Sequence, residues 1–288
     1  MDNFSARTMK LKHIFPKSRS GIVASAFLVG ILPTIYFYEL LVVLPTVHPG
    51  LSSTWAYVHI FCGTALFINC VGSIWKMMTV EITCRGHMLP SVLKPGWRFC
   101  YVCEHNAPPR SMHCSECDTC VLTRDHHCLF TDSCVGHSNK RYYMNFLITL
   151  CIGAIYCNIM NFDYTWHIIG GISFKSVFTM LLPMLTWLLG YAESFTFSVA
   201  FMSALCVVGC ALLLVLCTYH LMLILNGQTV YEKAKNIRDF DLGWKKNIIE
   251  VFGDHWYIAW ISPFIPSTLP SIGIEPPKRT RYEDLKDM

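Results

Sequence analysis

Residues 100–134 read CYVCEHNAPPRSMHCSECDTCVLTRDHHCLFTDSC, and this stretch decides how the rest of the chain is interpreted. Seven of the chain's 15 cysteines fall within it, and histidines are interleaved with them. Cysteine pairs separated by two residues, with histidines nearby, are typical of zinc sites. A dense cysteine cluster is also found in disulfide-linked secreted domains, so the cellular compartment decides between the two interpretations.

The number of metal donors in this stretch exceeds what two zinc ions need. A tetrahedral structural zinc takes four Cys or His ligands, so two ions take eight. Two Cys₃His sites use six of the seven cysteines and two of the histidines His113, His126 and His127, which leaves one cysteine over. A spare thiol beside a spare histidine and an aspartate suits a nucleophile, a base and the group that orients the base. The count does not identify the spare cysteine, but the run Asp125-His126-His127-Cys128 favours Cys128. The alternative is a purely structural zinc fold in which Cys128 has no role.

The composition of the whole chain points to lipid as its main solvent. Of the 288 residues, 53% are hydrophobic and only 15% are charged, whereas a soluble domain carries about 25% charged residues. The formal net charge of +4 is too small to indicate a nucleic-acid partner. We therefore expect an all-α polytopic membrane protein with a small cysteine-rich module, bound to a lipid bilayer and not to nucleic acid.

Long apolar segments flank the cysteine-rich stretch on both sides. About 20 apolar residues span a bilayer, and four segments are predicted to do so, at residues 21–45, 55–78, 142–162 and 196–225. The first is longer than the roughly 7–15 apolar residues of a signal peptide. Residues 176–191 are predicted to form a lumenal interfacial or re-entrant helix, because an even number of crossings returns the tail to the starting side. Five or six spans are the alternative.

The distribution of Lys and Arg predicts the orientation of these spans. Basic residues crowd the N-terminus (1–20), the module (79–141) and the tail (226–288), whereas the turn at 46–54 has none and 161–197 has only Lys175. Positive segments stay on the cytosolic side, so both termini and the module between the second and third spans are predicted to be cytosolic. The cytosol is reducing, which favours zinc over disulfides. No internal repeat is evident in the sequence.

The cysteine-rich segment resembles that of the DHHC family of protein S-acyltransferases (palmitoyltransferases), as a divergent subgroup. The resemblance covers residues 100–143 and rests on both Cys-x2-Cys pairs, His113-Cys114, the Asp125 to Cys128 run, Cys134-Val135-Gly136, Asn139 and Tyr143. Downstream, residues 226–232 resemble the family's Thr-Thr-x-Glu motif through Thr229 and Glu232, and residues 241–253 resemble its C-terminal motif through Asn247. Two spans, a cytosolic module, two spans and a short tail are also the family's arrangement.

The resemblance implies the roles of individual residues. One zinc would be held by Cys100, Cys103, His113 and Cys120, and the other by Cys114, Cys117, His127 and Cys134. Cys128 would accept a fatty acyl group from acyl-CoA (palmitoyl-CoA), with His126 and Asp125 as its partners, and pass it to membrane-proximal cysteines of substrate proteins. The family's setting implies endoplasmic reticulum or Golgi membranes.

Three departures from the family's pattern bear on activity. Leu129-Phe130 stands where the family has Pro-Trp, Val230 replaces the second Thr of Thr-Thr-x-Glu, and the Asp-Pro-Gly motif after the second span is missing. They leave a catalytically inactive zinc-binding membrane adaptor as the alternative function. A membrane-anchored RING ubiquitin ligase would use all its cysteines as ligands, and a metal transporter would carry polar ligands in its spans.

Several polar residues near or within the spans admit two interpretations. Lys140 and Arg141 are candidates to bind CoA phosphates, although basic residues at a span boundary more often act as positive-inside anchors. Ionisable residues inside a span are functional candidates, but His220 is more simply a hydrogen-bonded structural residue and Glu39 one that reaches the headgroups. His105 and His137 are expected to be solvated.

Overall fold

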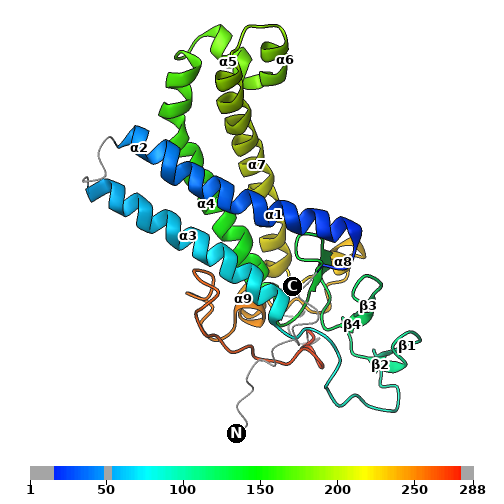
Figure 1. Ribbon diagram of the computed structural model, residues 1–288. Coiled ribbons are helices and arrows are strands. Elements are labelled where there is room, and N and C mark those ends of the chain that lie inside the picture. Colours follow the sequence, from blue (N-terminus) through cyan, green and yellow to red (C-terminus); the bar gives the residue numbers. More distant parts are fainter. Residues whose placement is uncertain (1–15, 49–53, 280–288) are drawn as a thin grey trace, which may run out of the picture. The chain divides into compact units, whose positions relative to one another are not determined.

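The computed structural model describes residues 16–48 and 54–279, and it contains four helices long and apolar enough to cross a membrane. The first, Arg19–Val47, consists of α1 (Arg19–Tyr38), a π-helical turn η2 (Glu39–Val43) and α2 (Leu44–Val47). The others are α3 (Thr54–Thr79), α4 (Lys140–Ile169) and α7 (Ser194–Leu225) (Figure 1). The predicted fold class, a multi-pass helical membrane protein with a cysteine-rich region between the second and third long helices, is confirmed. Of the segments that carried the orientation argument, residues 1–15, 49–53 and 280–288 lie outside the described residues.

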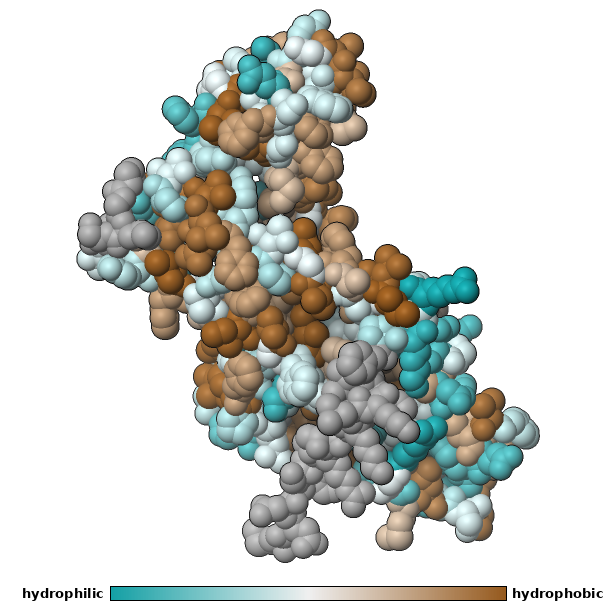
Figure 2. All heavy atoms as spheres, in the orientation of Figure 1, coloured by the Kyte–Doolittle hydropathy of each residue, from teal (hydrophilic) through white to brown (hydrophobic). Residues whose placement is uncertain are grey.

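The long helices expose apolar side chains in a way that suits lipid. On α7, Phe195, Leu212 and Val215 are each at least 60% exposed, and such surfaces are stable only next to hydrocarbon or another protein. Figure 2 shows apolar side chains gathered over the long helices, whereas hydrophilic side chains are concentrated around the hairpins of the cysteine-rich module.

Residues 174–188 form two short helices in place of a single helix over 176–191. They are α5 (Phe174–Leu181) and α6 (Pro183–Leu188). The side chain of Ser173 caps α5 by accepting a hydrogen bond from the amide of Ser176, and Pro183 begins α6, where its fixed φ angle is favourable. With 8 and 6 residues, both helices are too short to cross a bilayer.

Three two-stranded antiparallel hairpins make up the cysteine-rich module. They pair β1 (Arg98–Cys100) with β2 (His105–Ala107), β3 (Met112–Cys114) with β4 (Thr119–Val121), and β5 (His126–Cys128) with β6 (Ser133–Val135). Their first strands begin at residues 98, 112 and 126, so the unit repeats every 14 residues. In each hairpin the residue before the second strand, Glu104, Asp118 or Asp132, has a positive φ angle.

The expectation of no internal repeat was therefore wrong. The repeat is hidden because each strand has only three residues, and few letters besides cysteine recur from one hairpin to the next. A structural repeat this short depends on metal-ligand positions and turn geometry, and leaves almost no hydrophobic periodicity to detect.

The chain divides into two compact units. One contains residues 1–29, 69–146 and 218–288, and the other contains residues 30–68 and 147–217. The first unit holds the hairpins and two further helices, α8 (Val230–Ala234) and α9 (Trp244–Phe252). In the second unit, Asn161 donates a hydrogen bond to the carboxyl group of Glu39, so this carboxyl group has a protein partner.

Candidate metal centres and active site

Two groups of four donors gather within the hairpins. Cys100, Cys103, His113 and Cys120 form the first group, and Cys114, Cys117, His127 and Cys134 form the second, with the ligand atoms of each group within 4.8 Å of one another. In both groups the first hairpin of a pair supplies two cysteines, and the next hairpin supplies a histidine and a cysteine. Each group could thus hold a metal ion that ties consecutive hairpins together.

The donor chemistry and spacing of these groups fit zinc. Zn–S bonds of about 2.3 Å in a tetrahedron separate two sulfurs by about 3.8 Å, and the sulfurs of Cys117 and Cys134 lie 3.7 Å apart. Nδ1 of His127 lies 3.4 Å from the sulfur of Cys117, and Nδ1 of His113 lies 3.3 Å from that of Cys103. Both histidines therefore offer the same ring nitrogen to their group.

Asp132 supports the second group from outside. Its Oδ1 lies 3.3 Å from Nε2 of His127, the nitrogen that faces away from the three cysteines. The same carboxyl group accepts hydrogen bonds from the backbone amide of Lys17 and from the amide and hydroxyl of Ser18, at the start of α1. A carboxylate on the outer nitrogen of a ligating histidine fixes the ring and strengthens it as a ligand.

Cys128 belongs to neither group and lies beside His126 and Asp125. Nδ1 of His126 is 2.9 Å from Oδ2 of Asp125, and the Cys128 thiol is hydrogen-bonded to His126. Because Nδ1 is committed to the carboxylate, Nε2 is the nitrogen left to exchange a proton with a sulfur. The three side chains thus form the row of nucleophile, base and orienting carboxylate that the sequence suggested.

The charges of this row reinforce one another. Burial opposes ionisation of Asp125, but the Lys140 ammonium and His126 outweigh it and hold the pKa of Asp125 well below its usual range. Burial likewise lowers the pKa of His126, but Asp125 and Cys128 outweigh it and raise that pKa to about 9. Burial raises the pKa of Cys128, and its hydrogen bonds to His126 and Thr131 more than compensate, so the net shift is downward. These shifts favour an imidazolium–thiolate pair.

Asp125 is held by more than His126. Its Oδ1 accepts a 2.9 Å hydrogen bond from Lys140 Nζ at the start of α4 and a 3.3 Å bond from the backbone amide of Val230. Its Oδ2 also faces Nδ1 of His220 on α7, at 3.6 Å. The hydroxyl of Tyr143 lies 3.1 Å from Nε2 of His220, and the Tyr143 and His220 rings both pack against the His126 ring.

Asp125, His126 and His220 also lie close enough together to hold a metal ion. The Lys140 ammonium on the same carboxylate opposes a further cation there. We therefore interpret this group as the polar surroundings of the active site.

The residues resembling the downstream motifs lie next to this site. The side chain of Thr229 accepts a hydrogen bond from the amide of Glu232, and Glu232 bonds the amide of Thr229, which makes a capping box at the start of α8. Both carboxylate oxygens of Glu232 are bound by Arg110, at 2.7 Å each. The box holds the amide of Val230 toward Asp125, so the backbone supplies a donor at the position where the family's second Thr is missing.

The two asparagines of the resemblance serve as backbone clamps. Asn139 is fully buried; its oxygen accepts from the amide of Gly136, and its amide donates to Met77 and Cys134 carbonyls. Asn247 on α9 donates to the Leu225 carbonyl and accepts from the amide of Leu242. They tie the ends of α3 and α7 to the module and to the tail, respectively.

Lys140 and Arg141, the candidates for binding CoA phosphates, both have protein partners. Besides Asp125, the Lys140 ammonium reaches the Gln228 carbonyl at 3.3 Å, and its side chain is 8% exposed. Arg141 donates to the Ser267 carbonyl and to the Tyr142 hydroxyl. The binding of CoA phosphates by these two residues stays a prediction.

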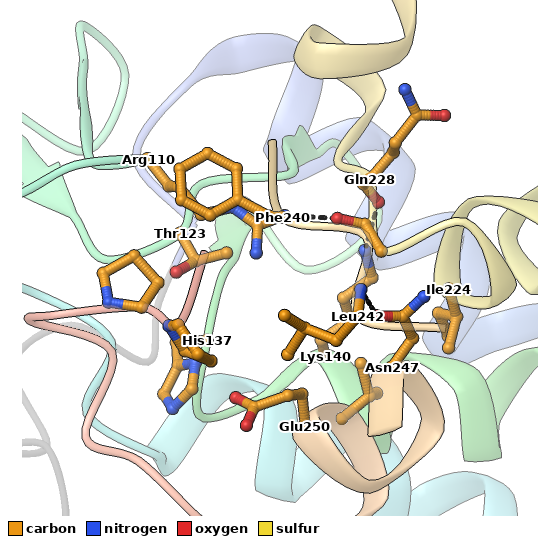
Figure 3. Close-up of a pocket in the computed structure, with 14 residues that line it drawn as sticks. Arg110, Thr123, His137, Lys140, Ile224, Gln228, Phe240, Leu242, Asn247 and Glu250 are labelled. Atoms are coloured by element: carbon orange, nitrogen blue, oxygen red, sulfur yellow. Dashed lines mark hydrogen bonds between the residues drawn. The ribbon is translucent and has the colours of Figure 1, made fainter. Parts of the chain in front are cut away.

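A cavity of about 50 Å³ lies behind the Lys140 ammonium (Figure 3). Figure 3 shows Arg110, His137 and Glu250 arranged around its open centre, with Phe240 and Leu242 from the tail. His137 is buried and hydrogen-bonded to the Ser271 carbonyl, so the expectation that it is solvated was wrong. His105 is half-buried.

Sequence reasoning missed the contributions of Arg110, Asp132 and His137 and the contact of Lys140 with Asp125. Arg110 and Glu232 are 122 residues apart, and no local pattern pairs them. Thr131, which is 3% exposed and hydrogen-bonded to Cys128, was also missed. Its place in the hairpin repeat was the available signal.

These features define a class: multi-pass membrane proteins with a cysteine-rich, metal-binding module that carries an Asp-His-His-Cys sequence. A family model described as DHHC palmitoyltransferase matches residues 94–237. The chain belongs to the DHHC palmitoyltransferase family, which confirms the resemblance noted from the sequence.

Individual relatives agree with this assignment. The "Probable palmitoyltransferase ZDHHC24" of Danio rerio is 36% identical over 225 residues, which cover 77% of this chain and 76% of that protein. The protein of the same name from Homo sapiens is 33% identical over 217 residues, covering 72% of this chain and 74% of that protein. The "Palmitoyltransferase ZDHHC20-B" of Danio rerio is 31% identical over 178 residues, covering 59% and 50%.

Proposed function

We propose that this protein is a protein-cysteine S-acyltransferase that moves a fatty acyl group from acyl-CoA to Cys128 and then to cysteines of substrate proteins. The observation that carries the proposal is the row Asp125–His126–Cys128, with the Cys128 thiol outside both metal-ligand groups. Ligand cysteines are committed to their metal, whereas this thiol remains available as a nucleophile.

The two steps follow from the chemistry of thioesters. In the first, the Cys128 thiolate attacks the carbonyl carbon of the acyl-CoA thioester, a new S–C bond forms, and the bond from that carbon to the CoA sulfur breaks. His126, which holds the proton of the thiol, gives it to the departing CoA sulfur. In the second, His126 accepts the proton of a substrate cysteine, whose sulfur takes the acyl group, and Cys128 leaves as a thiolate. Asp125 keeps the ring of His126 oriented throughout.

The two four-ligand groups are proposed to hold structural zinc ions. Zinc bound there would neutralise the thiolates and supply folding free energy, on the order of 10–16 kcal/mol per ion in small zinc modules. All four ligands of each group come from the protein, which is typical of structural and not catalytic zinc.

The acyl chain favours a reaction at the membrane surface. Each CH₂ buried in hydrocarbon contributes about 0.8 kcal/mol, so a long chain remains in the bilayer during transfer. The active site is built from the start of α4 (Lys140, Tyr143), the end of α7 (His220) and the hairpins. With the positive-inside pattern, these contacts support a module and tail on the cytosolic face, in endoplasmic reticulum or Golgi membranes.

The proposal is tested by acylation of the purified protein without any substrate protein. Incubated with palmitoyl-CoA, the wild type is expected to carry a hydroxylamine-labile acyl group on Cys128, detected by peptide mass spectrometry. Cys128→Ser should abolish it, because a hydroxyl is far harder to ionise than a thiol. His126→Ala should slow it by about 10²–10⁴-fold, the usual contribution of a general base.

The adjacent histidines provide a matched control. His126→Ala should keep two zinc ions per molecule, whereas His127→Ala should lose one and destabilise the module, because only His127 lies among the ligand atoms. If the wild type holds two zinc ions but is never acylated at Cys128, the enzyme proposal fails, and the inactive zinc-binding adaptor is the function that remains.

A further inference from the structure

The hairpin that carries the nucleophile is built like the two hairpins that carry metal ligands. In the first hairpin the sulfur of Cys100 accepts a hydrogen bond from the backbone amide of Cys103, at 3.4 Å. This amide-to-sulfur bond across a Cys-x2-Cys turn belongs to the geometry that gathers two ligands on one ion. The second hairpin has Cys114 and Cys117 at the same two positions.

The third hairpin has Cys128 and Thr131 at these positions, 14 residues further along. The first ligand position is therefore occupied by the nucleophile, and the second by a hydroxyl. A third metal site would also need a histidine and a cysteine from a following hairpin. The equivalent positions are Arg141 and Ile148, and both belong to α4. The repeat thus explains why Cys128 is the cysteine left over.

Thr131 directs two donors at the sulfur of Cys128. Both its backbone amide and its hydroxyl are hydrogen-bonded to that sulfur. The hydroxyl of Ser133 donates to Oγ1 of Thr131, at 2.9 Å, so the oxygen already accepts a bond and its own proton is left for the sulfur. Thr131 is 3% and Cys128 is 6% exposed, and water competes little for these bonds.

We propose that Thr131 is a further catalytic residue, which uses the turn geometry of a metal-binding hairpin to hold and stabilise the reacting sulfur of Cys128 in place of a metal ion. The proposal rests on the proposed function of Cys128 as the nucleophile. The sulfur carries negative charge before it attacks acyl-CoA and again when the substrate cysteine displaces it. The Thr131 donors stabilise the sulfur on one side, while His126 exchanges the proton on the other.

A pair of nearly isosteric substitutions tests the role of the hydroxyl. Thr131→Val keeps the shape of the side chain and removes the donor, whereas Thr131→Ser keeps the donor. The rate of Cys128 alkylation by iodoacetamide, measured by peptide mass spectrometry, is expected to fall about tenfold in Thr131→Val, the effect of losing one hydrogen bond to a charged atom. Acylation by palmitoyl-CoA should fall by a similar factor. Thr131→Ser should remain within about threefold of the wild type, since its donor is retained.

The controls separate this effect from a loss of fold. Zinc content should be unchanged in both variants. Thr79→Val removes a buried hydroxyl that bonds only the carbonyl of Trp75 within α3, and it should leave both rates unaltered. Equal rates for Thr131→Val and the wild type, at equal zinc content, would overturn the proposal. Alkylation needs no acyl-CoA, so this outcome is distinct from a failure of the acyltransferase proposal.

A third variant tests the equivalence of the hairpins directly. Thr131→Cys restores the Cys-x2-Cys spacing, so under diamide the introduced thiol and that of Cys128 should lose two protons and two electrons and form a disulfide. In Phe130→Cys the new side chain takes the place of a ring that is 44% exposed, and no such disulfide should form. A disulfide in Phe130→Cys but not in Thr131→Cys would show that position 131 does not face the sulfur.

Discussion

Asp125 is the residue on which the contacts of the active site converge. Its side chain is completely buried and pairs with Lys140, whose own side chain is 8% exposed. A buried charge without its partner is strongly destabilising, whereas the intact pair need contribute little to stability. Lys140 therefore acts on the carboxylate that orients His126, and this role differs from the phosphate contact expected from the sequence.

Substitution of Lys140 separates the two roles. Lys140→Met keeps the length of the side chain and leaves Asp125 uncompensated, so it should lower the free energy of unfolding by about 3–5 kcal/mol. The double variant Lys140→Met/Asp125→Asn should recover part of this loss, because no buried charge is stranded. Thermal unfolding in detergent measures both effects.

The affinity for palmitoyl-CoA gives the second readout. It should be unchanged in Lys140→Met if the ammonium serves Asp125 alone, and the matched variant Arg141→Met provides the comparison. A stable Lys140→Met protein with clearly weakened palmitoyl-CoA binding would instead favour the phosphate contact.

At the scale of elements, the sequence predicted whatever depends on composition over a long window. The four long helices occupy the four predicted apolar segments, with ends within a few residues except for α4, which continues to Ile169. Hydropathy over about 20 residues is a strong signal because lipid leaves few alternatives to a helix. The three-residue strands gave no comparable signal, so their repeat was missed, and so was the place of Thr131 within it.

The active site could be predicted only where its residues are neighbours in the chain. Asp125, His126 and Cys128 form one run, so their proximity was readable. The contacts of Asp125 with His220 and with the Val230 amide depend on how α7 and α8 return to the hairpins. Such contacts are set by tertiary packing, and one sequence carries no local trace of them.

The contact between the third hairpin and α1 yields a prediction at this scale. Asp132→Ala removes both the carboxylate on His127 and the acceptor for the first residues of α1. Loss of such an outer partner typically weakens metal binding by about 10–100-fold. One zinc per molecule should therefore pass more quickly to a coloured chelator, while the other is released at the wild-type rate.

The repeat offers a matched control for this variant. Asp118 occupies the equivalent position in the second hairpin, with a φ angle of 49° against 43° for Asp132, and its side chain is exposed. Alanine is similarly strained at both positions, so Asp118→Ala corrects for the backbone. Equal zinc release from the two variants would mean that the carboxylate of Asp132 does not support the metal site.

For the whole molecule, the contacts of the tail determine what topology is acceptable. Arg110 of the module binds Glu232, and Lys140 and Val230 meet on Asp125, so the segment after α7 packs against the hairpins. A tail on the opposite side of the membrane would break each of these bonds. An even number of crossings is thus required by the active site itself, independently of the distribution of Lys and Arg.

Glycosylation mapping in microsomes tests this topology. An Asn-x-Thr acceptor inserted at Gly170-Gly171, in the turn after α4, should be modified, because that turn is predicted to be lumenal. The same acceptor at the C-terminus should stay unmodified. The chain's own Asn3-Phe4-Ser5 acceptor reports on the N-terminus in the same experiment and should also remain unmodified. Modification of the C-terminal acceptor would place Glu232 and Val230 across the membrane from Asp125, and the active site described above could not assemble. Modification of Asn3 alone would instead mean that α1 does not begin on the cytosolic side, which its bonds from Ser18 to Asp132 require.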